Sequence, residues 1–134
     1  MIAAGVKNKK YLTVGDADTA LRIGSGSLPV LATPRVAALM EAAACESVEA
    51  LLEPGATSVG TRLELAHLSA DPVGATVVCE SELTEVDGRR LVFRLVLRDG
   101  AGVAAEATHE RFIVQRDRFL QKAAEKLSAQ KVES

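Results

Sequence analysis

Aromatic residues and long apolar runs are both scarce in this chain of 134 residues. Aromatic side chains make up 3% of it and tryptophan is absent, so aliphatic side chains must fill most of the core. No apolar run approaches the roughly 20 residues of a membrane-spanning helix, and we expect no membrane partner. The N-terminus lacks the basic-then-apolar order of a signal peptide, which predicts a cytoplasmic location.

Cysteines are few and the net charge is small. Cys45 and Cys79 do not have the spacing of metal ligands, so we expect two free, buried thiols in a reducing cytoplasm and no metal site. A net charge of −2 gives no general attraction to nucleic acid. The remaining composition, 48% hydrophobic and 25% charged, is typical of an ordinary globular domain, and we expect a single domain over residues 1–134.

The segment Val30–Leu52 predicts one long helix. Thr33 is expected to cap its N-terminus, because a threonine hydroxyl can accept hydrogen bonds from the first amides of a helix. Pro34 follows at the first helical position, where a backbone N–H is not needed. About nineteen residues rich in Ala, Leu, Met and Glu come next, and the Pro-Gly pair at 54–55 predicts the end of the helix.

One carboxylate lies off the polar side of this predicted helix. At about 100° per residue, most of its polar residues form one solvated stripe, namely Arg35, Glu46, Glu49 and Glu53. Glu41 falls about 120° from part of that stripe, among apolar residues. Because an unpaired buried carboxylate is costly, Glu41 needs an ion pair, an exit to the edge or a chemical purpose, and the helix alone does not decide among them.

The stretch 57–69 alternates as a strand does. Leu63, Leu65 and His67 share one face with Thr61, which puts a histidine on the apolar side. A lone histidine on such a face is usually structural, but a histidine and a carboxylate that both point inward favour chemistry. Gly60 lies in the same strand, where glycine often marks a bulge or a close approach of the backbone to a ligand.

The rest of the chain predicts further strands joined by hairpins. A three-residue loop, 87–89, is preferred between two of them because it pairs Leu83 with Phe93 and keeps the apolar faces together. In the last strand an inward face leads to His109 and Arg111, and a bulge or an edge position is expected near Arg111. The expected strands are Tyr11–Val14, which is short, then Gly74–Glu85, Arg90–Arg98 and Val103–Gln115.

The arginines of the strand at 90–98 point outward and have two interpretations. They form either a solvated, ion-paired face, which is the commoner case, or a surface that docks phosphates. After the last strand, residues 118–134 form a polar tail that is expected to be partly helical, so the core covers about residues 10–117.

The predicted order is a short strand, a long apolar helix and then four strands. A helix that is apolar over most of its circumference must be wrapped, and an antiparallel sheet curled around it satisfies this requirement. This is the hotdog architecture, of the α+β class. Because one edge strand remains free, we expect a homodimer, or a tetramer built from it.

Five segments in order resemble the fluoroacetyl-CoA thioesterase-like branch of the hotdog thioesterases. They are TPRVAALME at 33–41, EPGATSVGT at 53–61, LELAHLSADPVGATV at 63–77, EVDGRRL at 85–91 and THERFIV at 108–114. The resemblance covers about residues 30–120. It implies an enzyme that hydrolyses a small or medium acyl-CoA thioester, with coenzyme A as part of the substrate and no other cofactor.

Matched position by position, the resemblance implies that Thr33, Glu41 and His67 are catalytic and that Gly60 and Arg111 contact the substrate. Glu41 and His67 would act as nucleophile toward the acyl carbon or as general base that positions or deprotonates water. The role of Thr33 competes with its expected role as N-cap. Eight helical residues, about 12 Å, separate Thr33 from Glu41, so we expect the site to be completed across a dimer or to span the thioester.

Two other functions remain open. In the family's namesake, aromatic residues in the lid before the threonine close over the acyl group, whereas residues 14–29 here contain none. An open lid fits a non-catalytic module that binds or senses acyl-CoA, and some hotdog proteins are enoyl-CoA hydratases. The implied catalytic set favours the thioesterase, and turnover separates these functions.

Overall fold

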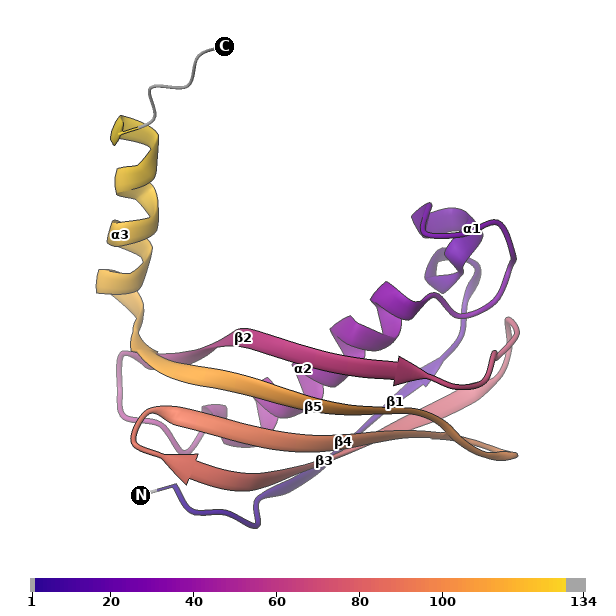
Figure 1. The fold of residues 1–134 in the computed structure, drawn as a ribbon, viewed down its shortest axis with the longest axis horizontal. Coiled ribbons are helices and arrows are strands. Elements are labelled where there is room, and N and C mark those ends of the chain that lie inside the picture. The colour runs from indigo at the N-terminus through magenta and orange to yellow at the C-terminus, as the bar shows by residue number, and fades with distance from the viewer. Residues whose placement is uncertain (1, 130–134) are drawn as a thin grey trace.

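The computed structural model describes residues 2–129, which form one curved antiparallel sheet around a long helix (Figure 1). The five strands follow the order β1-β3-β4-β5-β2, so β1 and β2 are the edges. The elements in chain order are β1 (Lys7–Thr13), the 3-10 turn η1 (Asp16–Asp18), α1 (Ala20–Ile23), α2 (Thr33–Glu49), β2 (Ala56–His67), β3 (Thr76–Asp87), β4 (Arg90–Asp99), β5 (Gly102–Gln115) and α3 (Arg116–Ala129).

The core lies between α2 and the concave face of the sheet. The inward residues of β4 are fully buried, as their alternation predicts, and these are Leu91, Phe93, Leu95 and Leu97. They form one apolar cluster with the buried side of α2, made of Val36, Leu39, Met40, Ala43, Ala44 and Val48. Small and aliphatic side chains at these positions let the helix lie close to the sheet, which compensates for the lack of aromatic residues.

The start of α2 differs from the prediction by one residue. Ala32 is the N-cap, with extended backbone, and Thr33 and Pro34 are the first two helical residues. The prediction that Thr33 caps the helix is therefore wrong. The first four amides of any helix lack partners within it, so proline fits the second position as well as the first. This shift leaves the Thr33 hydroxyl free for a contact outside the helix.

A bulge divides β2 into two halves. The pairing of β2 with β5 shifts between Gly60 and Arg62, which leaves Thr61 as the extra residue. Thr61 is exposed and donates to the carbonyl of Glu110 at 3.2 Å, so its predicted place on the face of Leu63 is wrong. A bulge does lie near Arg111, but it is in β2, the strand that pairs with Arg111 of β5.

The β3–β4 hairpin has the predicted pairing of Leu83 with Phe93 and a shorter loop. Asp87 pairs with Arg90, so only two residues, 88 and 89, turn the chain instead of three. A second bulge at Thr84 absorbs the difference in register. Gly88 takes a left-handed conformation, with φ of 62°, which two-residue hairpins require.

Both ends of the chain are more regular than predicted. The first strand begins at Lys7 rather than at Tyr11. At the other end, α3 confirms the expected helix in the tail, apart from residue 130, which lies outside the described residues. No residue of α3 is buried, and the helix projects beyond the β2 edge of the sheet (Figure 1).

Cys79 is buried and Cys45 is half-buried, and both thiols are free. Burial raises the pKa of the Cys79 thiol to about 12. The expectation of two free thiols is confirmed, although only one of them is fully buried. Within residues 2–129, no helix has both the length and the hydropathy needed to cross a membrane.

Candidate functional site

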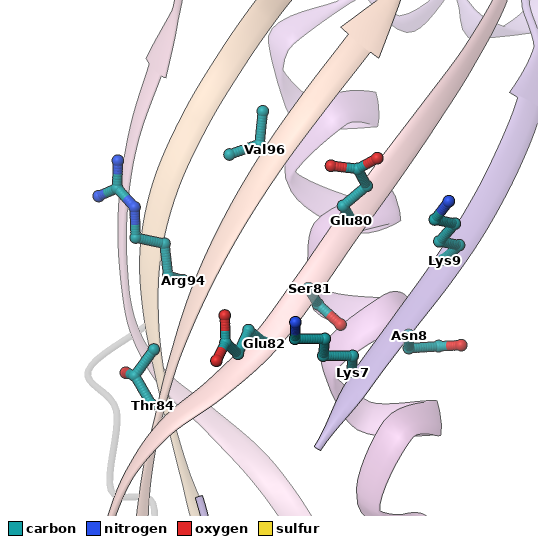
Figure 2. A pocket seen from close by; sticks show the side chains of 9 residues that line it. All are labelled: Lys7, Asn8, Lys9, Glu80, Ser81, Glu82, Thr84, Arg94 and Val96. Atoms are coloured by element: carbon teal, nitrogen blue, oxygen red, sulfur yellow. The ribbon is translucent and has the colours of Figure 1, made fainter. Parts of the chain in front are cut away.

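One hollow lies on the outer face of the sheet, away from α2. It measures about 760 Å³ and crosses β1, β3 and β4 (Figure 2). The charged side chains that line it are of both signs. In the sheet, Glu82 of β3 pairs with Lys7 of β1 on one side and with Arg94 of β4 on the other. None of the residues implied in catalysis or binding lines it, so it is not the candidate site.

The outward arginines of β4 are ion-paired, which supports the solvated face and not the phosphate dock. Arg90 binds Glu85 and Glu110 at 3.1 and 3.2 Å. The neighbouring pairs are Arg94 with Glu106 at 3.7 Å and Arg98 with Glu80 at 3.0 Å.

Thr33 and His67 form the first half of the candidate site. Thr33 begins α2 and His67 ends β2, and the Thr33 Oγ1 lies 2.8 Å from the His67 Nδ1. Both line a hollow of about 320 Å³ together with the loop at 30–32 and residues 68–70. The Nε2 of His67 is buried and has no hydrogen-bond partner among the described residues. Burial lowers the pKa of His67, so the imidazole is neutral near pH 7 and able to accept a proton.

Glu41 and Gly60 form the second half. The Glu41 carboxylate lies over the Gly60 backbone, so close that a Cβ on Gly60 would be 2.9 Å from the Glu41 Oε2. Both residues line a hollow of about 410 Å³ with Arg111 and Cys45. Among the described residues, Glu41 forms no ion pair, so the ion-pair interpretation of this carboxylate gains no support. The residue is half-buried beside the hollow, which agrees with the exit to the edge as well as with a chemical role. The carboxylate fits at this position because Gly60 has no side chain.

Arg111 is held rigidly beside this glycine. Only 7% of the residue is exposed. Its Nε donates to the Ser58 hydroxyl at 2.7 Å and its Nη2 to the Ser58 carbonyl at 2.9 Å. Its Nη1 donates to the Nε2 of His109 at 3.1 Å. A guanidinium has five N–H donors; three are used here, which leaves two for a ligand.

His109 is the residue of this cluster for which no role is predicted from the sequence. It is fully buried, and its Nδ1 lies 2.7 Å from the carbonyl of Arg62. Burial first, and then the charge of Arg111, lower the pKa of the imidazole. The available signal was its position two residues before Arg111 on the inward face of one strand, because such residues are neighbours.

The two halves lie far apart along β2 within one chain, with His67 at the end of the strand and Gly60 near its middle. Gly60 and His67 are seven residues apart, and at ~3.3 Å per residue this separates them by roughly 23 Å. The structure thus brings Thr33 to His67 and Glu41 to Gly60 and Arg111, but it does not bring Glu41 to His67. The strand that carries both halves, β2, is an edge of the sheet.

Proteins of known class share this architecture. A hot-dog-like protein from Thermanaerovibrio acidaminovorans, 25% identical, superposes with a TM-score of 0.86 over 93% of each chain. A solved structure of the fluoroacetyl-CoA thioesterase FlK, 30% identical, superposes with a TM-score of 0.88 and covers 94% of this chain and 98% of that chain. The predicted hotdog fold of the α+β class is therefore confirmed, and the chain is a hotdog-fold thioester hydrolase.

Sequence comparison narrows this class to one family. The fluoroacetyl-CoA thioesterase of Streptantibioticus cattleyicolor is 38% identical over 100 residues, which are 75% of this chain and 72% of that protein. The family model described as fluoroacetyl-CoA-specific thioesterase matches residues 14–117. The chain belongs to the fluoroacetyl-CoA-specific thioesterase family, and the resemblance inferred from its motifs is confirmed.

Proposed function

We propose that this protein hydrolyses a small or medium acyl-CoA thioester to the free acid and CoA at a site shared by two subunits. In this site, Glu41, Gly60 and Arg111 of one subunit face Thr33 and His67 of the other. The observation that carries the proposal is the unpartnered Nε2 of His67 at the end of an edge strand and the Glu41 carboxylate against Gly60 of the same strand.

The free edge of β2 supports the shared site. When two copies of one strand pair antiparallel about a two-fold axis, each end meets the opposite end of the other copy. An axis between Leu63 and Glu64 would put Gly60 opposite the partner subunit's His67. The exposed side chains of Pro34 and Ala38 on α2 are small, which leaves room for a neighbouring helix on the same side.

The proposed reaction uses water as the second substrate. The neutral imidazole of His67 accepts a proton at Nε2, while the Thr33 hydroxyl holds the ring through Nδ1. The Glu41 carboxylate either orients the water or attacks the acyl carbon itself, and both alternatives stay open. When water attacks, a new C–O bond forms, the C–S bond breaks, and the CoA thiolate takes up a proton. When Glu41 attacks, the same bonds change to give an acyl anhydride on Glu41, which water then hydrolyses to the free acid and the carboxylate.

Arg111 and the backbone at Gly60 would stabilise the transition state. The two remaining guanidinium N–H groups and the nearby backbone are donors for the oxygen that becomes negative during attack on the thioester. Because Arg111 is already fixed by Ser58 and His109, little reorganisation accompanies this charge. A rigid, positively charged donor beside the reacting carbon supports hydrolysis better than simple binding.

The acyl group would lie under an aliphatic lid. Residues 14–29 hold no aromatic side chain, and Leu21, Ile23 and Leu28 are 53%, 42% and 64% exposed. A solved structure of FlK holds fluoroacetate and CoA. The lid of the present protein offers aliphatic contacts without an aromatic ring, so we propose small or medium aliphatic acyl groups as substrates and a cytoplasmic site of action, where CoA thioesters are available.

Release of free CoA tests this function. Purified protein is assayed against acetyl-, fluoroacetyl-, short branched, phenylacetyl- and long-chain acyl-CoA, and an enoyl-CoA is included to detect hydration. Glu41→Ala and His67→Ala should each lower kcat by at least ~100-fold while both remain folded. Glu46→Ala is the matched control, because Glu46 lies on the same helix in an exposed ion pair with Lys10.

Three outcomes contradict the proposal in different ways. Binding of an acyl-CoA without turnover establishes the non-catalytic module in place of the enzyme. Water addition to the enoyl-CoA, with no CoA released, establishes the hydratase. Turnover that survives both substitutions leaves a thioesterase but removes Glu41 and His67 from its mechanism.

A further inference from the structure

A buried polar contact next to the proposed site is not used by the proposed reaction. His109 has no exposed surface, and its ring packs against Phe93 with the ring centroids 6.2 Å apart. A histidine in the core of a small domain costs stability unless both ring nitrogens have partners. Here both do, and the chemistry of the two partners fixes the state of the ring.

The two hydrogen bonds define one tautomer. The partner of Nδ1 is the carbonyl of Arg62, which can only accept, so Nδ1 carries the proton. The partner of Nε2 is the Nη1 of Arg111, which can only donate, so Nε2 must offer a lone pair. A second proton on His109 would place two N–H groups against each other and a positive charge against a guanidinium.

These two bonds join the bulge of β2 to the guanidinium on β5. The carbonyl of Arg62 comes directly after the bulged residue Thr61, and Gly60 comes directly before it. The Cε1 of His109 would lie 3.1 Å from a Cβ on Gly60. The imidazole thus touches the two features that shape the Glu41 half of the site, namely the bare glycine backbone and Arg111.

We propose that His109 is a positioning residue for thioester hydrolysis, which holds the Arg111 guanidinium at the Gly60 bulge through its neutral, Nδ1-protonated imidazole. This inference rests on the proposed function, because Arg111 needs a fixed direction only if it stabilises a transition state. It assigns no contact with substrate to His109 itself.

The charges around His109 preserve this neutral state. Arg111 on β5 lowers its pKa in the same direction as burial, whereas the carboxylates of Glu41 on α2 and Glu110 on β5 act in the opposite direction. Arg62 on β2 contributes its backbone carbonyl, which also favours the charged ring. Burial is the largest of these effects, so the ring stays neutral at the pH at which the enzyme would work.

Two substitutions separate the two hydrogen bonds. In His109→Gln the amide oxygen reaches the place of Nε2 and still accepts from Arg111, but the bond to the Arg62 carbonyl is lost. In His109→Asn the shorter amide still donates to the Arg62 carbonyl, but Arg111 loses its acceptor. Each variant loses one buried bond, so the two are matched in their cost to folding.

The inference predicts unequal kinetics for this matched pair. We expect kcat to fall ~100-fold in His109→Asn and less than ~10-fold in His109→Gln, with KM within about threefold of wild type in both, since misplacement of a charged donor acts on the transition state. Thermal unfolding of both variants measures their folding. A purely structural role predicts equal losses of kcat that follow the losses of stability.

A measurement without turnover tests the same contact. In the wild type, imidazole ¹⁵N chemical shifts should report a neutral, Nδ1-protonated His109 at pH 7. Equal kcat in the two variants, or a ring protonated at Nε2, overturns the positioning role while CoA release by the wild type stands. A wild type that releases no CoA from any thioester overturns the proposed function, and the positioning role falls with it.

Discussion

At the scale of single residues, the space left by Gly60 decides the geometry of the candidate site. A Cβ there would meet the Glu41 carboxylate at 2.9 Å, the His109 ring at 3.1 Å and the Arg111 guanidinium at 3.3 Å. All three approaches are tighter than ordinary contacts. His109 and Arg111 are buried and held by hydrogen bonds, whereas the Glu41 oxygen is the end of a half-buried side chain. Any side chain at position 60 must therefore displace a group that the proposed mechanism uses.

Gly60→Ala should lower kcat by ~100-fold or more, because one added carbon pushes the Glu41 carboxylate and Arg111 away from their positions. The overpacking should also cost about 1–3 kcal/mol of unfolding free energy. Steady-state kinetics and urea unfolding measure the two effects. Gly100→Ala is the control, since a Cβ added to Gly100 would have no neighbour within 4 Å and should change neither quantity. An active Gly60→Ala enzyme would show that this close approach is irrelevant to turnover.

A second residue-scale effect concerns Asp71, which lies in the loop that follows His67. Asp71 is only 4% exposed, and its backbone carbonyl accepts from the amide of Leu31, which ties the loop to the segment before α2. Burial first, and then the nearby Asp99, raise the pKa of Asp71 to about 6. The proton it holds and the amides of the β4–β5 turn lower the pKa of Asp99, which stays charged.

The contribution of Asp71 to stability should consequently fall as pH rises from about 4 to about 7. A carboxyl whose folded pKa is raised stabilises the protein fully below its unfolded pKa of ~3.9, and this contribution disappears as pH passes the folded pKa. Asp71→Asn should remove this contribution from the pH dependence and be more stable than wild type at pH 8 by about 1–3 kcal/mol. Urea unfolding at pH 4.5, 6 and 8 measures this, with exposed Asp87→Asn as the control. An equal pH slope in wild type and Asp71→Asn would contradict the expectation.

At the scale of elements, the helices and strands that were predicted correctly are those whose apolar residues recur with an unbroken period. The helix α2 and the strand β4 each keep one apolar side along their length, so their faces and the pairing of Leu83 with Phe93 follow from the pattern. The motifs also identified both halves of the candidate site. A period cannot reveal a bulge, because one extra residue, such as Thr61 or Thr84, reverses the face of everything after it.

Contacts between segments far apart in the chain could not be predicted from the sequence, for a different reason. The Thr33 hydroxyl had two possible partners, the amides of its own helix and a side chain 34 residues away, and the latter is the one it has. His109 likewise acquires its partners only when β2 and β5 pair around the bulge. Such contacts depend on register, which a single sequence does not specify to within one residue.

Helix α3 should be dispensable for folding of the single chain. None of its residues is buried, although Phe119, Leu120 and Leu127 are apolar and 43%, 60% and 77% exposed. Removal of residues 118–134 should change the unfolding free energy by less than about 0.5 kcal/mol, because few contacts with the sheet are lost. Denaturant unfolding at low protein concentration measures this. A large loss would show that α3 packs against something in solution, and sedimentation at several concentrations would show whether that is a second copy.

At the scale of the whole molecule, the shared site can be tested by mixing two inactive variants. In a heterodimer of Glu41→Ala with His67→Ala, one of the two sites carries both substitutions and the other carries neither. Random pairing of equal amounts makes half of the dimers mixed, so activity should return to about a quarter of the wild-type value. CoA release after joint refolding measures this, and each variant refolded alone is the control. No recovery, with mixed dimers demonstrated by mass, would put each complete site within one chain.

The exposed aliphatic lid has a thermodynamic consequence for ligand binding. Leu21, Ile23 and Leu28 meet water in the free protein, and an acyl chain that lies beneath them would bring both surfaces out of contact with solvent. Loss of hydrated apolar surface lowers the heat capacity of a complex. Titration calorimetry of Glu41→Ala with a series of acyl-CoAs, at several temperatures, should therefore give a heat-capacity change that becomes more negative with each added methylene. This trend should stop when the acyl chain outgrows the lid. The chain length at which it stops measures the size of acyl group that the protein accepts.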